Sequence, residues 1–320
     1  MERWIDGDEN ANQMLARVFM ARPFLLPPPL HGVPLRVGNV VELIGPSPSA
    51  KTHILSQTAI SCILPERWND VEYGGLDRLV VFIDLDCRFD IMRLSEMLNY
   101  RIMEVEGVVD GDHRKTLYNL CMSRFLYIHC YNSFEFLQTL KTLHYRLQKE
   151  EEAHGISSLV LMIDSIGAFH WVDRATAFLP PRDSSRKNLF SQTVSEAVVQ
   201  EIKKVTQMHP MLVIATKSTI FMDRYSAASN VAKWNFIKDN QQAERVSRNV
   251  TRNDQAIQYR EYMPSVWQAF VTHRILVRAS EDYRVMSNHE NCSFYTLEWL
   301  VPRLNSSERL VVKDAGIFVD

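Results

Sequence analysis

The sequence has few of the features that mark secreted, membrane or nucleic-acid-coating proteins. Its five cysteines are odd in number and include no CxxC pair, so neither a disulfide framework nor a zinc ribbon is indicated. No apolar run approaches the ~18 residues that a membrane-spanning helix needs, and the acidic N-terminus lacks the apolar core of a signal peptide. Lys and Arg total 36 against 38 Asp and Glu, which gives no general attraction to nucleic acid or to anionic membranes. We therefore expect a globular protein of a reducing compartment, cytosol or nucleus, with no membrane contact.

The chain of 320 residues is 46% hydrophobic and can bury a substantial core. Residues 1–38 differ from the rest because five prolines, at positions 23, 27, 28, 29 and 34, prevent them from extending a helix or joining a central strand. We interpret residues 1–38 as a Pro-rich arm, laid over the core or held by a partner, and residues 39–320 as one core domain.

Short apolar runs alternate with segments of helical periodicity from residue 40 onward. Strands are predicted at 40–44, 79–85, 125–129, 159–163 and 211–215, and helices at 51–62, 90–101, 134–152 and 192–208. Uninterrupted apolar strands separated by helices indicate an α/β fold, with a mostly parallel sheet covered on both faces. Strands predicted at 267–277, 294–297 and 309–312 extend one edge in hairpin arrangement. Residues 220–262 are polar and aperiodic, and are expected to form a long functional loop.

The run from Gly45 to Thr52, Gly-Pro-Ser-Pro-Ser-Ala-Lys-Thr, follows a predicted strand and opens a predicted helix. In that context the pattern GxxxxGK[ST] is a phosphate-binding loop, although a chance turn is the plainer alternative. Backbone N–H groups would face the phosphates, Lys51 would reach the β- and γ-phosphates, and the Thr52 hydroxyl would hold Mg²⁺. The candidate ATP-binding residues of this loop are Gly45, Ser49, Ala50, Lys51 and Thr52.

A second acidic position is Asp164, at the end of the apolar run Leu159-Val160-Leu161-Met162-Ile163. A carboxylate there could hold Mg²⁺ or a metal-bound water beside the phosphate loop. Many strands end in Asp, so the residue alone indicates little. Its place downstream of a phosphate loop, in the same predicted sheet, makes Asp164 a candidate metal and nucleotide ligand.

Three further stretches make the identity of the core more specific. They are Cys62-Ile63-Leu64-Pro65 with Gly74-Gly75, the run Val81-Phe82-Ile83-Asp84-Leu85-Asp86-Cys87-Arg88-Phe89, and the run Ile163-Asp164-Ser165-Ile166-Gly167-Ala168-Phe169-His170-Trp171. With the phosphate loop and Trp267, they make the chain resemble the RecA-type recombinase family, in its eukaryotic recombinase-paralogue branch, from about Leu35 to Val277. The resemblance implies a RecA-like ATPase core that uses ATP and Mg²⁺, and a nuclear role in homologous-recombination repair, including meiosis.

Three departures from the family pattern predict a degenerate site. Ala50 replaces a glycine, and Pro46 and Pro48 remove two amide donors; if position 50 needs a glycine-only conformation, alanine costs about 1–3 kcal/mol there. Asp86 aligns with the catalytic glutamate but is one methylene shorter, and a displacement of about 1 Å can cost roughly a hundredfold in rate. The Asn-Gln pair that senses the γ-phosphate is Lys217-Ser218 here. Hydrolysis is therefore expected to be slow, or to depend on a partner and on DNA.

The resemblance also places single-stranded DNA near two polar segments, 173–189 and 221–262. The basic DNA-contact candidates are Arg174, Arg182, Arg186, Lys187, Arg245, Arg248 and Arg252. An ordinary solvated loop remains an equal alternative for these segments. Trp171 and Trp267 each sit beside an apolar strand and are interpreted as core or interface anchors rather than base-stacking groups.

Residues 1–38 lack the Phe-x-x-Ala motif by which the family polymerises. The resemblance then implies that the chain binds one recombinase-paralogue subunit and ends a heteromeric assembly. Two functional hypotheses remain: a weakly catalytic subunit that assists recombinase filament assembly on single-stranded DNA, and a DNA-dependent ATPase completed by a neighbouring subunit. A small-metabolite kinase is not favoured, because no arginine-rich lid segment follows the core.

Overall fold

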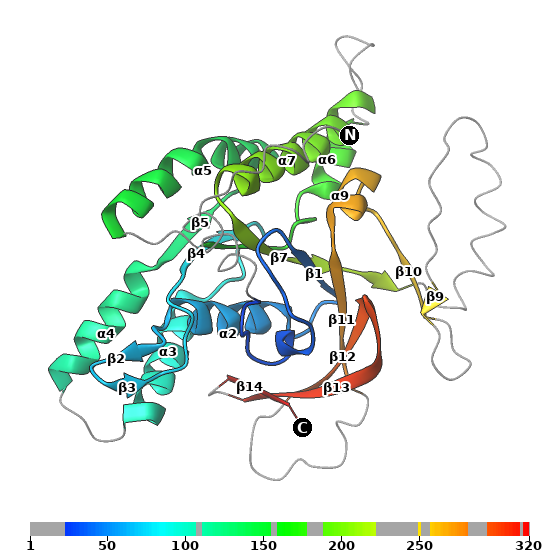
Figure 1. The fold of residues 1–320 in the computed structure, drawn as a ribbon. Helices are drawn as coiled ribbons and strands as arrows, with labels where there is room; N and C mark the ends of the chain where they lie inside the picture. Colours follow the sequence, from blue (N-terminus) through cyan, green and yellow to red (C-terminus); the bar gives the residue numbers. More distant parts are fainter. Residues whose placement is uncertain are drawn as a thin grey trace, which may run out of the picture.

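The computed structural model describes residues 23–106, 111–154, 159–177, 188–221, 249–250, 257–280, 293–313 and 316–319 (Figure 1). The main sheet consists of β1 (Val40–Gly45), β4 (Leu79–Asp84), β5 (Phe125–His129), β6 (Leu159–Asp164), β7 (Met211–Ser218), β11 (His273–Ala279), β12 (Ser293–Val301), β13 (Arg303–Lys313) and β14 (Gly316–Val319). The helices are η1 (Leu30–Gly32), α2 (Lys51–Ile63), α3 (Ile91–Glu106), α4 (Gly111–Ser123), α5 (Ser133–His154), α6 (His170–Ala177), α7 (Asn188–Met208) and α9 (Ser265–Phe270). The short strands are β2 (Arg67–Trp68), β3 (Val71–Glu72), β8 (Ile220–Phe221), β9 (Asn249–Val250) and β10 (Ile257–Arg260).

The strand order of the main sheet is β14-β13-β12-β11-β1-β7-β6-β4-β5. All pairs from β11 to β5 are parallel, whereas β12, β13 and β14 join as an antiparallel edge. The predicted α/β fold, with its mostly parallel sheet and antiparallel C-terminal edge, is thereby confirmed. Because the carboxyl ends of β1, β4, β6 and β7 meet at one edge, the turns that follow them share one end of the molecule.

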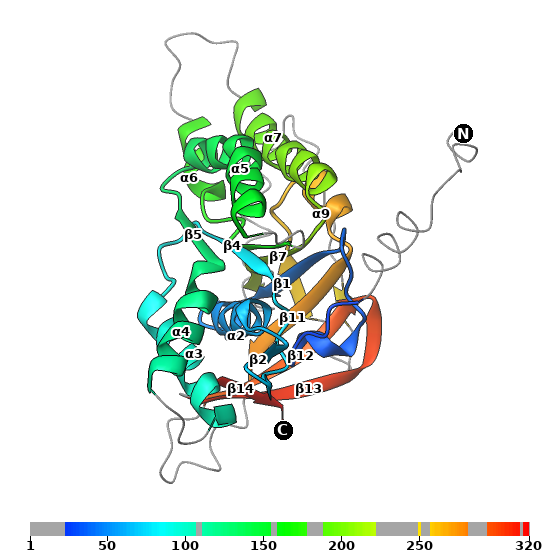
Figure 2. The ribbon, with the colours of Figure 1, turned by 60° about the vertical axis from the view of Figure 1, so that its left-hand side comes forward.

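Helices cover both faces of the sheet, as the sequence predicted (Figures 1 and 2). Side chains of α2, α3 and α4 enter one apolar cluster with alternate residues of the strands, for example Val80 and Phe82 of β4. Those of α5, α7 and α9 enter the second cluster, with Val81 and Ile83 from the same strand. Residues in β4 therefore alternate between the two faces while every one of them is buried, which explains its uninterrupted apolar sequence.

The proline-rich residues that the structure describes, from 23 onward, lie against this core. Phe24, Leu26, Leu30 and Leu35 are buried in the first apolar cluster, whereas Leu25 points outward and is 80% exposed. The Phe24 backbone N–H donates to the Leu35 carbonyl at 2.7 Å, which closes the segment into a loop. This part of the predicted arm thus contributes apolar contacts to the core, and residues 1–22 lie outside the described part of the chain.

The start of one predicted strand was wrong, and helices α4 and α6 were not predicted, although α6 covers the first part of the predicted loop 173–189. Residues 265–270 form helix α9 instead of the start of a strand, because Pro264 stands at its N-cap and Val266, Trp267 and Phe270 recur at helical spacing toward the second cluster. Helix α4 was missed, since only Leu117 and Cys121 of this polar segment are fully buried apolar residues.

The prediction of a structureless loop over 220–262 needs correction at its two ends. Strand β10 pairs antiparallel with β8 and with β9, so that a small three-stranded sheet lies beside the main sheet. Strands of two to four residues are too short for a hydrophobic period to be recognised, which is why the sequence did not reveal them. Residues 222–248 and 251–256 lie outside the described ranges.

Candidate nucleotide-binding site

The candidate site is built around the β1–α2 loop, residues 45–51, at the carboxyl end of a central strand. Strand β1 lies between β11 and β7, and the Gly45 carbonyl accepts a hydrogen bond from Thr219 N at 2.9 Å. A Cβ atom at Gly45 would lie 2.1 Å from the Val277 carbonyl oxygen of β11. Glycine is required here because two backbones approach each other closely.

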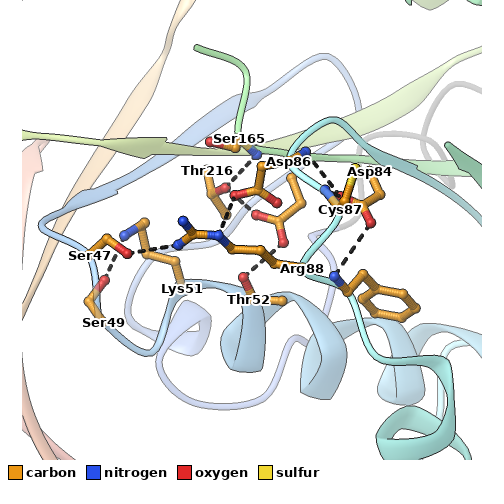
Figure 3. Close-up of polar contacts among 12 residues, drawn as sticks. Ser47, Ser49, Lys51, Thr52, Asp84, Asp86, Cys87, Arg88, Ser165 and Thr216 are labelled. Atoms are coloured by element: carbon orange, nitrogen blue, oxygen red, sulfur yellow. Dashed lines mark hydrogen bonds and ion pairs between the residues drawn. The ribbon is translucent and has the colours of Figure 1, made fainter. Parts of the chain in front are cut away.

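Lys51 is the first residue of α2 and its side chain folds back over the β1–α2 loop (Figure 3). Its Nζ donates to the Gly45 carbonyl at 3.1 Å, the Pro46 carbonyl at 2.9 Å and Ser49 Oγ at 2.7 Å. Burial lowers the pKa of Lys51 to about 8, against the opposing effect of nearby carboxylates. The ammonium group is thus held by loop oxygens at the point where an anionic ligand would bring its own oxygens.

Ala50 does not carry the backbone strain considered from the sequence. Its φ is −72° and its ψ is 16°, a region open to any L-residue, so the glycine-only penalty does not arise. Its side chain is buried and packs in the first apolar cluster. The loop's remaining departures are Pro46 and Pro48, which lack the N–H donors that a phosphate would use.

Thr52 and Asp164 lie in direct contact, although 112 residues separate them. The Thr52 hydroxyl donates to Asp164 Oδ2 at 2.8 Å, and the Thr216 hydroxyl donates to Asp164 Oδ1 at 2.5 Å. Burial raises the pKa of Asp164, while these two hydrogen bonds favour its ionised form. The carboxylate at the end of β6 is therefore fixed in orientation by α2 on one side and β7 on the other.

Asp86 lies in a turn that the buried Asp84 organises. Asp84 Oδ1 accepts from the backbone N–H of Asp86 at 3.2 Å and of Cys87 at 3.0 Å, and its Oδ2 accepts from the Tyr127 hydroxyl. Burial, together with the negative charges of Asp164 and Asp84, raises the pKa of Asp86 to about 6. One Asp86 oxygen, Oδ1, is buried without a hydrogen-bond partner.

Arg88 extends from the turn after β4 to the β1–α2 loop (Figure 3). Its Nη1 donates to Ser47 Oγ at 2.9 Å, and its Nε lies 3.8 Å from Asp86 Oδ2. Sequence reasoning missed both Arg88 and Thr216. The available signals were a cation two residues beyond Asp86, and a hydroxyl inside the apolar strand 211–218.

Replacing Asp86 with Asn is expected to stabilise the folded chain by about 1 kcal/mol at pH 8, because it removes a partly buried charge and its repulsion by Asp164 and Asp84. Partial exposure of the side chain keeps the gain small. The pKa of Asp86 is about 6 in the folded state against an ordinary 3.8. The gain should therefore shrink as pH falls through 6 and vanish below about 3.8. Urea unfolding at pH 8 and pH 5 measures it, with the exposed Asp112→Asn as control. A less stable Asp86→Asn variant at pH 8 would contradict the argument.

The basic DNA-contact candidates are mostly outside the described ranges. Arg174 is exposed on α6, whereas Arg182, Arg186, Lys187, Arg245, Arg248 and Arg252 fall in segments of which the structure describes nothing.

The two tryptophans, Trp171 and Trp267, differ in their surroundings. Trp267 is fully buried, as predicted, but Trp171 is 42% exposed and rests against Tyr262 at a ring distance of 5.7 Å. Trp171 is therefore not a core residue, and its interpretation as an interface anchor stays a prediction.

Two classes of feature are absent from the part of the chain that the structure describes. None of its helices combines the length and apolar character that crossing a bilayer requires. Nor does it hold a group of three or more His, Cys, Asp and Glu side chains arranged as a metal site.

The fold and this site together define the class of the protein. It is an α/β protein with a mostly parallel sheet, compatible with a RecA-like core, in which a lysine-bearing loop and three aspartates meet where the central strands end.

Comparison with known proteins specifies the family. The chain is 48% identical to a DNA repair protein XRCC2 homolog from Arabidopsis thaliana, over 97% of this chain and 88% of that relative. It is 24% identical to the DNA repair protein XRCC2 of Mus musculus, over 77% of this chain and 74% of that protein. The chain therefore belongs to the XRCC2 family of DNA repair proteins. No family model matches the sequence.

Proposed function

We propose that the chain is a subunit of a recombinase-paralogue complex that promotes homologous-recombination repair of DNA double-strand breaks in the nucleus, including meiotic cells. It assists assembly of a recombinase filament on single-stranded DNA and ends its heteromeric complex. Its own ATP site is degenerate and turns over slowly. The family membership and the recombinase-like sequence stretches support the repair role.

One observation carries the nucleotide part of the proposal: Lys51, Thr52 and Asp164 meet at the first turn of a helix whose N-cap residue makes no side-chain capping bond. A helix start without a side-chain cap presents backbone N–H groups that suit phosphate oxygens. Lys51 adds a positive charge there, and its present partners are neutral oxygens of its own loop. This arrangement supports the proposal that the β1–α2 loop binds a triphosphate.

The donor set also fits Mg²⁺. Thr52 and Asp164 supply hard oxygen ligands, and Asp86 Oδ1 is a buried oxygen with no partner of its own. Mg²⁺ is usually held by one or two carboxylates together with substrate phosphates and water, so a full cage of protein ligands is not needed. When bound, the ion neutralises phosphate charge, while Thr52 and Asp164 hold it and Lys51 contacts the phosphates.

Equilibrium binding of a fluorescent ATP analogue, by the chain alone and with a paralogue subunit, tests the proposal. The Lys51→Met variant is expected to bind 10- to 100-fold more weakly, because charged hydrogen bonds contribute about 1.5–3 kcal/mol each. Lys115→Met is the matched control, because it removes the same charge from an exposed position on α4. Equal affinity of the wild type, Lys51→Met and Lys115→Met would reject an ATP site at this loop.

A second candidate function, a DNA-dependent ATPase completed by a neighbouring subunit, is favoured by Asp86. A carboxylate whose pKa is raised to about 6 accepts a proton more readily near neutral pH than an ordinary aspartate does. Its unpartnered Oδ1 is available for a hydrogen bond to water. Partner- and DNA-stimulated turnover that Asp86→Asn abolishes, with ATP affinity unchanged, would establish this function; turnover equal to that of the isolated chain would exclude it.

A further inference from the structure

A buried network of four charged side chains lies next to the candidate site, where β1, β7 and β11 run side by side. Lys217 Nζ lies 3.0 Å from Glu42 Oε1 and 2.8 Å from Glu261 Oε1. Arg274 Nε donates to Glu42 Oε2 at 2.6 Å, and Arg274 Nη2 lies 4.0 Å from Glu261 Oε2. Trp267 Nε1 donates a further hydrogen bond to Glu42 Oε1 at 2.8 Å. These four charged side chains, which we call the buried tetrad, are at most 7% exposed.

The charges of the buried tetrad balance, with two carboxylates against two cations. A buried ion costs several kcal/mol to desolvate, and a balanced, hydrogen-bonded group offsets that cost only while all of its members are present. Removing one member would leave an uncompensated charge in the interior. The buried tetrad therefore stabilises the fold only when all four side chains are in place, so it can hold the chain segments that carry them in one arrangement.

The four members come from four separate segments. Glu42 lies in β1, three residues before Gly45 and the β1–α2 loop. Lys217 lies in β7, three residues before β8, and Glu261 directly follows β10. Strands β8 and β10 pair with each other, so Lys217 and Glu261 flank both ends of the segment that leaves the main sheet after residue 219.

Further contacts continue from Glu261 to the turn that follows β6. Glu261 Oε1 accepts from the backbone N–H of Tyr262 at 3.1 Å and of Met263 at 3.0 Å. The Tyr262 ring then lies against Gly167, where a Cβ atom would come within 2.4 Å of its hydroxyl. Glu261 thus fixes the backbone that places Tyr262 over the turn beyond Asp164.

We propose that the buried tetrad is a latch that joins β8 and β10 to strand β1 of the main sheet, beside the β1–α2 loop. Lys217 is the central member, because it contacts carboxylates from both sides. In this arrangement Lys217 joins Glu42 of β1 to Glu261, the residue that follows β10.

Hydrogen–deuterium exchange of the full chain without nucleotide tests the latch. In the wild type, peptides covering 218–221 and 257–263 are expected to be protected. Glu261→Gln, which keeps size and removes one charge, and Lys217→Met should each speed exchange there at least tenfold. The double variant Lys217→Met with Glu261→Gln restores charge balance and should exchange more slowly than either single variant. The β6 peptide, residues 159–164, separates this local opening from global unfolding.

Glu298→Gln is the matched control, because Glu298 pairs with Arg278 at 3.5 Å on the same sheet but away from the latch. It should leave exchange at 218–221 and 257–263 unchanged. Equal exchange in the wild type and both single variants, or unprotected wild-type peptides, would overturn the proposal. Since no nucleotide is added, a failure of ATP binding at the β1–α2 loop does not alter this result, and the two proposals fail separately.

Discussion

Replacing Gly45 with alanine is expected to destabilise the folded chain by about 3 kcal/mol, because the new methyl group has no space. The nearest atom to its Cβ, at 2.1 Å, is the Val277 carbonyl oxygen, followed by Ser49 Oγ at 3.2 Å. A side chain could rotate away, but the carbonyl belongs to β11, which is bonded to β1 along the parallel ladder. The collision can therefore be relieved only if strands β1 and β11 move apart. Urea unfolding monitored by tryptophan fluorescence measures the loss.

Gly38→Ala separates this collision from the general cost of replacing a glycine. Gly38 has a φ of +84° with no atom within 4 Å of a Cβ, so alanine there meets backbone strain but no neighbour. That strain is expected to cost about 1 kcal/mol. If Gly45→Ala is at least as stable as Gly38→Ala, the close approach of β1 and β11 is not the reason that position 45 requires glycine.

The main sheet could be predicted from the sequence because each of its central strands is a short apolar run that can be recognised without knowing its neighbours. Runs such as Leu79–Asp84 and Leu159–Asp164 are apolar throughout, and strands buried on both faces read this way whatever their neighbours are. The pairing of Thr52 with Asp164 followed from the same logic, since parallel strands and their following turns meet at one edge. Local pattern plus sheet geometry thus placed the main parts of the candidate site.

What the sequence could not reveal depends on contacts between distant residues. Glu42 interrupts an apolar strand, yet its partner Arg274 lies 232 residues away and its partner Trp267 lies 225 residues away. Lys217 was considered only as a departure from a phosphate sensor, because nothing near it in sequence indicates a buried carboxylate. Ala50 is a similar case: the substitution is visible in the sequence, but its consequence depends on a φ of −72° that the sequence does not give.

Replacing Glu42 with alanine is expected to destabilise the chain by about 3–5 kcal/mol at pH 7, because it leaves Lys217 and Arg274 with one carboxylate in a dry interior. Burial alone would raise the pKa of Glu42, but Lys217, Arg274 and the Trp267 hydrogen bond outweigh it and lower the pKa below 4.5. The contribution of Glu42 is therefore complete above its unfolded pKa and is lost as pH falls through the lower, folded pKa. Urea unfolding at a series of pH values measures both effects.

Glu298→Ala is the control for the loss of a carboxylate on the same sheet. Its partner Arg278 is 32% exposed, so water can solvate the guanidinium when the pair is broken, and the cost should stay within about 1 kcal/mol. Both variants lose one carboxylate and one arginine contact, and Glu42→Ala also loses the contacts with Lys217 and Trp267, so the contrast measures what the fully buried network adds. Equal losses for Glu42→Ala and Glu298→Ala would mean that water reaches Lys217 and Arg274 in the folded protein. The buried tetrad would then be an ordinary solvated ion pair network, with no capacity to hold β8 and β10 to the main sheet.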